Sequence, residues 1–169
     1  MMRRATTRRE CLRAIGLALA ALVSPEAASA QAKNRLVVVV NKSNTMDDMS
    51  STELRRILLG EVTRWPRNEK ITILLLPAGS EERKALLRIL LRMSDDDFTR
   101  YWISRVFQGE ATAGPKTAAS PAMLLRLVSG LSSAIGVLNE AALAEAHPDL
   151  KVLRIDGRVP RDEGYPFVW

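Results

Sequence analysis

The sequence predicts an α/β sandwich. Short apolar runs at residues 36–40, 71–76 and 133–138 are rich in aliphatic side chains and are typical of buried strands. The first two runs are each followed by a helix-start signal and an amphipathic segment. Strands that alternate with helices pack as layers around a sheet, and this order is what predicts the fold class.

The first 30 residues have the pattern of a secretory signal peptide. Five arginines come before an apolar run at residues 14–23, and Ala-Ser-Ala at residues 28–30 is a typical cleavage site. The apolar run is too short to cross a membrane, which takes about 20 residues. The Arg-Arg pair at residues 8–9 also resembles a twin-arginine export motif, so both export routes stay open. We therefore expect a periplasmic protein.

Cleavage would leave one predicted domain at residues 31–169, in a chain of 169 residues that is 47% hydrophobic and 26% charged. Five arginines and two glutamates lie before the cleavage site, so half of the formal net charge of +6 belongs to the signal segment. This removes the main argument for a nucleic-acid partner. The single cysteine, Cys11, is lost as well, which excludes disulfides and thiolate chemistry in the mature chain.

The first strand leads into a polar loop at residues 41–45. Ser43 and Asn44 in this loop have side chains that can bind an oxyanion or cap their own backbone. A helix follows, because Ser50 fits a capping box and Leu54, Ile57 and Leu58 form one apolar face. Gly60 stands where a left-handed helix stop is expected.

The second strand ends in a glycine-serine turn that opens the next helix. Gly79 and Ser80 come directly before a predicted helix at residues 81–93, which Ser80 is placed to cap. Leu86, Leu87, Ile89 and Leu90 are expected to face inward. Free amides converge at such a strand-to-helix turn, so the junction is a candidate anion site.

A third helix is expected after Ser94, which is followed by three aspartates. Phe98, Tyr101, Trp102, Val106 and Phe107 recur at helical spacing. We interpret them as a core stripe rather than as a stacking platform for a base or a sugar, because rings at this spacing are usually buried.

A glycine-containing loop at residues 108–115 precedes Lys116 and Thr117. These two residues either add a charge and a hydroxyl to the anion site or lie in solvent beside the next helix. Ser120 is predicted to cap that helix with Pro121 at its first position, and Gly130 to close it. Its expected inward residues are Met123, Leu124, Leu127 and Val128.

The rest of the chain completes the sheet. Gly136 inside the third strand indicates a close backbone approach. A short helix is expected at residues 139–147, with His147 as an ordinary exposed residue, and an edge strand at residues 151–156. The apolar tail at residues 157–169 either docks onto the domain or projects toward a partner.

The order of these elements resembles the second lobe of periplasmic phosphate-binding proteins, the substrate-binding subunits of ABC importers. The resemblance covers about residues 35–156: a strand, an Asn-x-Ser-Asn loop, a Ser-x-x-Glu-Leu-Arg-x-Ile-x-x-Gly helix, and then Trp65 and Pro66. It implies a single lobe of the type II periplasmic-binding-protein fold, with a mixed sheet flanked by helices.

The resemblance also implies a phosphate signature, Ser-Gly-Thr-Arg, at the second junction. Ser80 and Arg83 match it, whereas Glu81 and Glu82 replace the glycine and the threonine. Two carboxylates would repel a bound dianion, so this junction is either only a capped helix start or a site for a ligand less negative than phosphate. In the third strand, Val137 stands where the family often has tyrosine.

The sequence therefore favours a non-catalytic domain that binds phosphate or a related small oxyanion, linked to an ABC importer permease. The alternative is a scaffold of the cell envelope that keeps the fold without a ligand. A lone lobe encloses only one side of a ligand, so weak affinity is expected. No cofactor, metal site or acid-base pair for an enzyme is predicted. The predicted ligand-binding residues are Ser43, Asn44, Gly79, Ser80, Arg83, Lys116 and Thr117.

Overall fold

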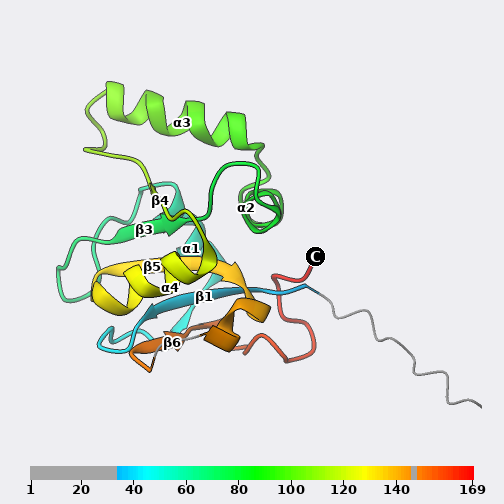
Figure 1. Cartoon of the computed structure of the whole chain (residues 1–169). Helices are drawn as coiled ribbons and strands as arrows, with labels where there is room; N and C mark the ends of the chain where they lie inside the picture. The colour runs from blue at the N-terminus through cyan, green and yellow to red at the C-terminus, as the bar shows by residue number, and fades with distance from the viewer. Residues whose placement is uncertain (1–33, 146–147) are drawn as a thin grey trace, which may run out of the picture. The chain divides into compact units, whose positions relative to one another are not determined.

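The computed structural model describes residues 34–145 and 148–169, which belong to one compact unit, Gln31–Trp169 (Figure 1). The predicted signal peptide and His147 lie outside the described residues. Within the described part of the chain, no helix is long and apolar enough to span a bilayer.

The elements follow the predicted order. The strands are β1 (Leu36–Asn41), β2 (Asp48–Met49), β3 (Thr72–Leu75), β4 (Lys116–Thr117), β5 (Ala134–Asn139), β6 (Leu150–Val152) and β7 (Arg154–Ile155). The α-helices are α1 (Ser51–Leu58), α2 (Glu81–Leu86), α3 (Asp95–Phe107) and α4 (Pro121–Gly130). A π-helical turn, η1 (Leu87–Leu91), continues α2, and a 3-10 helix, η2 (Glu140–Glu145), takes the place of the short helix expected after β5.

The main sheet is mixed, as the resemblance implied. Its strand order is β4-β3-β5-β1-β6. Strand β3 runs parallel to both β4 and β5, whereas β1 runs antiparallel to both β5 and β6. The edge strand expected at residues 151–156 is divided: β6 lies at the edge of this sheet, and β7 pairs with β2 in a separate two-stranded sheet.

Both faces of β1 are covered, which confirms that this run is a fully buried strand. Val38 and Val40 belong to one apolar cluster, with residues of α1, α2 and α3. Val37 and Val39 belong to a second cluster, on the face that α4 covers. Successive side chains of a strand point to opposite faces, so one apolar run supplies both halves of the core.

The predicted helix starts are confirmed. Each capping hydroxyl accepts a hydrogen bond from the amide three residues later: Ser50 from Glu53 at 3.1 Å, Ser80 from Arg83 at 3.4 Å, Ser94 from Asp97 at 3.1 Å and Ser120 from Met123 at 3.2 Å. Gly60 has a φ of +70°, the left-handed conformation expected of a helix stop. These signals are local, so the chain near each cap decides them.

The second helix differs from the prediction in its last turn. The π-helical turn has more residues per turn than an α-helix, so the buried positions shift by one residue along the sequence. Leu91 is buried there, whereas Ile89 and Leu90 are only half-buried against the core.

The interpretation of the α3 aromatic stripe as core is wrong for its last turn. Phe98 and Trp102 are buried, but Val106 is 40% exposed and Phe107 is 91% exposed. Figure 1 shows α3 beyond the β4 edge of the sheet rather than over either face. The core therefore reaches only the first turns of the helix. Met123 on α4 is likewise 41% exposed instead of inward.

The C-terminal tail docks onto the domain. Tyr165 and Phe167 are buried, and the Tyr165 hydroxyl donates a hydrogen bond to the Leu36 carbonyl at 2.9 Å. The Leu36 amide in turn donates to the Phe167 carbonyl at 2.9 Å. Burial raises the pKa of Tyr165 far above its ordinary value, so this phenol stays neutral and keeps its donor. The tail is part of the core of the domain.

Candidate functional site

The candidate site is the junction between β3 and α2. The chain leaves the strand through Leu76 and turns at Gly79, whose φ of +84° suits a glycine. Ser80 then starts α2, and its hydroxyl oxygen is engaged by the amide of Arg83. Arg83 thus lies one helical turn from the glycine turn, on the same side as the end of the strand.

A carboxylate of this chain occupies the donors of the junction. The Gly79 amide donates a hydrogen bond to Asp95 Oδ2 at 3.0 Å, and Arg83 Nε donates to Asp95 Oδ1 at 2.5 Å. Arg83 Nη1 also reaches the Leu76 carbonyl at 3.4 Å. The side chains of Arg83 and Asp95 are only 10% and 18% exposed, so their attraction is less screened than that of a surface pair.

The geometry is that of a small oxyanion site. One oxygen of a two-oxygen group lies on a backbone amide, and the other lies on a guanidinium. A phosphate, a sulfate or a free carboxylate offers oxygens of the same kind. The junction therefore directs a backbone amide and a guanidinium at one carboxylate, and that carboxylate belongs to Asp95.

The role of Asp95 was not recognised in the sequence. It stands at the first position of α3, where an acid is already explained by the helix dipole. Its partners are 16 and 12 residues away, and no local spacing indicates that pairing. Glu81, which raised the concern about repulsion, instead pairs with Lys84 at 3.0 Å on the surface.

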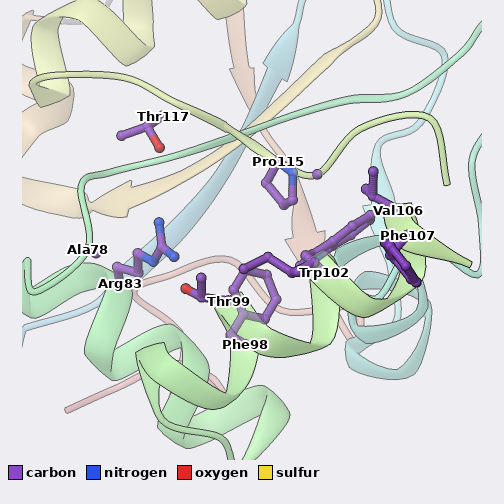
Figure 2. A pocket seen from close by; sticks show the side chains of 11 residues that line it. Ala78, Arg83, Phe98, Thr99, Trp102, Val106, Phe107, Pro115 and Thr117 are labelled. Atoms are coloured by element: carbon purple, nitrogen blue, oxygen red, sulfur yellow. The ribbon is translucent and has the colours of Figure 1, made fainter.

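Thr117 is brought to the same region, and Lys116 is not. In β4, Thr117 pairs in register with Leu75 near the end of β3, and its side chain lines a cavity together with Arg83 (Figure 2). Lys116 lines a different hollow, which Lys70 also lines. Neighbouring residues of a strand point to opposite faces, which separates these two side chains.

Ser43 and Asn44 lie at the opposite end of the sheet from this junction. In the register, Val40 near the end of β1 faces Ile135, and Thr72 at the start of β3 faces Ala134. The end of β1 is therefore beside the start of β3, not its end. Because β1 is antiparallel to β5, the loop that holds Ser43 and Asn44 does not join the predicted ligand-binding residues at the β3–α2 junction.

The side chains of the loop at residues 41–45 bind within the loop. This agrees with the alternative that they cap their own backbone rather than bind an oxyanion. The Ser43 hydroxyl donates to Asn41 Oδ1 at 2.7 Å, and Asn44 Oδ1 accepts from the Met46 amide at 2.9 Å. Asn41 also donates to the Ser129 carbonyl at 2.7 Å, at the C-terminal end of α4. That helix end carries a partial negative charge, which disfavours an anion here.

A cavity of about 610 Å³ adjoins Arg83 on the side of α3. Its polar side chains are Arg83, Thr99 and Thr117. Its apolar side chains include Phe98, Trp102, Ile103, Val106, Phe107 and Pro115. Figure 2 shows the Arg83 guanidinium reaching into the space below Thr117, with Thr99 beside it. The exposed turn of α3 thus forms the outer wall of a hollow that ends at the anion site.

Metal binding finds no support in the part of the chain that the structure describes. No group of three or more histidine, cysteine, aspartate or glutamate side chains there could hold an ion. The Ser94 hydroxyl and Arg100 lower the pKa of Asp97, so this acid is engaged within its own helix. Two of the three aspartates at the start of α3 are therefore engaged with side chains of this chain, Asp95 with Arg83 and Asp97 with Ser94 and Arg100.

Comparison with known proteins shows the fold. No protein family matches the chain, and no curated protein matches it. A phosphate ABC transporter substrate-binding protein from Clostridium perfringens, solved with bound phosphate, is 17% identical with a TM-score of 0.60, over 75% of this chain and 47% of that one. An ABC-type phosphate transport receptor from Vibrio cholerae is 19% identical with a TM-score of 0.58, over 75% of this chain and 48% of that one. PstS from Borrelia burgdorferi is 15% identical with a TM-score of 0.65, over 80% of this chain and 54% of that one.

The chain spans about half the length of these solved structures. At such low identity the likeness is one of fold, and it confirms a mixed α/β domain like part of a substrate-binding protein.

Proposed function

We propose that this chain, which has the fold of about half of a phosphate-transport binding protein, is an exported, non-catalytic domain that binds a small oxyanion at the β3–α2 junction. Phosphate is the first candidate. The observation that carries this proposal is the pair of hydrogen bonds that Asp95 receives from Gly79 and Arg83. The donors of an oxyanion site are present, oriented and already bound to an oxyanion-type group.

An external anion must displace Asp95 to take both the Gly79 amide and Arg83 Nε. The carboxylate is tethered at the start of α3, so it competes at a high effective concentration. Glu81 and Glu82 add further negative charge to the first turn of α2. We therefore expect weak affinity for phosphate, and we expect a singly charged anion to be repelled less than a dianion.

The contacts we propose are the Gly79 amide, the Ser80 hydroxyl and the Arg83 guanidinium, with the Thr117 hydroxyl across the cavity. The Ser80 hydroxyl accepts a hydrogen bond from the Arg83 amide, and its own proton is still available to donate to a ligand. Ser43, Asn44 and Lys116 are left out of the proposed site, because they lie elsewhere on the domain.

Export and transport complete the proposal. Export to the periplasm rests on the signal-peptide pattern of residues 1–30, and a link to an ABC importer permease rests on the names of the structural neighbours. Cell fractionation of the full-length protein and of a form lacking residues 1–30 tests export. We expect only the full-length form to reach the periplasm.

Isothermal titration of the purified protein with phosphate and with sulfate tests binding. We expect weak binding in the millimolar range that is lost in Arg83→Met. Met123→Ser on α4 is the control, because that side chain is exposed and does not line the cavity beside Arg83. Absence of heat with either anion at millimolar concentration, with the fold intact, would remove the proposal.

A second candidate function is a ligand-free interaction domain of the cell envelope. The observation that favours it is the exposed apolar side chains of α3, Ile103, Val106 and Phe107. The tail no longer supports this alternative, since Tyr165 and Phe167 are buried. Affinity capture from periplasm with the wild type and with Phe107→Ser distinguishes it, because this function requires a partner that depends on α3 and on no anion.

A further inference from the structure

The cavity next to Arg83 is larger and more apolar than a phosphate requires. Its volume of about 610 Å³ lies within the range of about 300–1,000 Å³ that organic ligands occupy in proteins. Most of its wall is carbon, from Phe98, Trp102, Pro115 and the exposed Phe107. A phosphate ion bound at Arg83 would leave this apolar wall in contact with water.

The charge of the cavity is confined to one end. Among the described residues that line it, Arg83 is the one with an ionised side chain, and Thr99 and Thr117 add hydroxyls beside it. Arg83 uses Nε on Asp95 and Nη1 on the Leu76 carbonyl, and Nη2 makes no hydrogen bond within the described part of the chain, which leaves its two donors for a ligand. Because Asp95 already balances part of the guanidinium charge, one additional negative charge suits this end better than two.

The position of the apolar wall fits the same ligand. Figure 2 shows Phe98, Trp102 and Pro115 following one another away from Arg83, with Val106 and Phe107 at the far end. A small molecule with its carboxylate on Arg83 would lay its body along the near part of this wall, because Phe107 lies about 13 Å beyond Phe98 on α3. Water would then leave the exposed carbon of α3, which is the main favourable term in binding an apolar group.

We propose that this cavity binds a small organic monocarboxylate with an aromatic or branched aliphatic body. Its carboxylate binds Arg83 and Thr117, and its body packs on Ile103 and Pro115 beside Trp102. This inference rests on the proposed function, because Arg83 belongs to the same oxyanion site, and it names the class of ligand that the site takes.

Titration of the purified protein with four probes tests the inference. Benzoate has the charge and the body, acetate has the charge alone, benzyl alcohol has the body alone, and phosphate tests the proposed function separately. We expect benzoate to bind at least about tenfold more tightly than acetate or benzyl alcohol, a difference of about 1.4 kcal/mol in each case. We also expect amide chemical shifts to change near Arg83, Thr117 and the last turn of α3.

Two exposed apolar residues provide a matched pair of variants. Ile103→Ser removes part of the wall at a side chain that is 64% exposed, so folding is unaffected, and we expect a severalfold loss of benzoate affinity. Met123→Ser, outside the cavity, is expected to bind benzoate as the wild type does.

The outcomes separate the two proposals. If benzoate binds no better than acetate or benzyl alcohol, or if Ile103→Ser and Met123→Ser bind it equally, the inference is overturned. Phosphate binding in that case leaves the proposed function standing. Benzoate binding without phosphate binding supports the inference and replaces phosphate as the ligand, and binding of neither anion overturns both.

Discussion

Asp95 and Arg83 are joined by a hydrogen bond of 2.5 Å between Oδ1 and Nε, and the second oxygen of the same carboxylate accepts the amide of Gly79. This relationship connects the first residue of α3 to the start of α2. It has two consequences, one for stability and one for ligand binding, and each can be measured.

Arg83→Met is expected to destabilise the protein by about 1.5–3 kcal/mol, because it removes a hydrogen bond between charged groups and leaves Asp95 partly buried without its cation. Urea denaturation gives the free energy of unfolding. Arg100→Met is the control, since Arg100 pairs with Asp97 at the same distance of 2.5 Å but the two side chains are 74% and 51% exposed. We expect its loss to be below about 1 kcal/mol. Equal losses in the two variants would contradict the role assigned to burial.

Gly136→Ala is expected to cost about 1–3 kcal/mol of stability. A Cβ at this position would lie 2.5 Å from Leu124 Cδ2, so the Leu124 side chain must shift, and Val128 Cγ2 at 3.2 Å limits the room for it. Gly130→Ala is the matched change at the end of α4, where a Cβ meets nothing within 4 Å, and we expect no loss. Thermal unfolding of both variants provides the comparison, and similar melting temperatures would mean that α4 does not pack closely on this strand.

Phe167→Ala tests the docking of the tail. The ring is 1% exposed, so its removal should cost about 3–5 kcal/mol. Phe107→Ala makes the same chemical change at an exposed ring and should leave the unfolding free energy nearly unchanged. A small effect of Phe167→Ala would show that the tail contributes little to the core.

Asp156 links acid stability to the start of α1. Hydrogen bonds from the Ser51 hydroxyl and amide lower the pKa of this carboxyl below its ordinary value of 3.8. A depressed pKa in the folded state adds stability above the unfolded pKa, and that stability is lost as the pH falls through the folded pKa. We expect the wild type to exceed Asp156→Asn in stability near neutral pH and the difference to shrink below about pH 4.

Asparagine is the right replacement at this position, because residue 156 has a φ of +52° and asparagine tolerates the left-handed conformation well. Urea denaturation midpoints of the two proteins between pH 7 and pH 2.5 provide the measurement. A difference that does not depend on pH would contradict the link.

The features that the sequence predicted correctly are local ones. The four predicted capping serines each accept a hydrogen bond from the amide three residues later: Ser50, Ser80, Ser94 and Ser120. Gly136 lies where Leu124 and Val128 leave no room for a side chain. Such signals are contained in a few adjacent residues, so a single sequence is enough to identify them.

The features that the sequence did not reveal depend on distant partners. The direction of β1 is set by its pairing with β5, about 100 residues later, and this direction removes Ser43 from the site. The contact between Asp95 and Gly79 depends on the position of α3 beside the junction. The helical spacing of Phe107 is the same whether the core extends that far or not, so periodicity alone could not identify its exposure.

The most direct test of the account is a calorimetric titration of Asp95→Asn with phosphate, beside the wild type and Asp96→Asn. Asparagine keeps an acceptor for the Gly79 amide and removes the charge that competes with the ligand, whereas Asp96 is an exposed acid at the next position of α3. The account predicts that Asp95→Asn binds phosphate about tenfold more tightly, a gain of about 1.4 kcal/mol, and that Asp96→Asn resembles the wild type. Equal affinities of Asp95→Asn and Asp96→Asn, or no binding by folded Asp95→Asn, would contradict an oxyanion site that holds its own carboxylate.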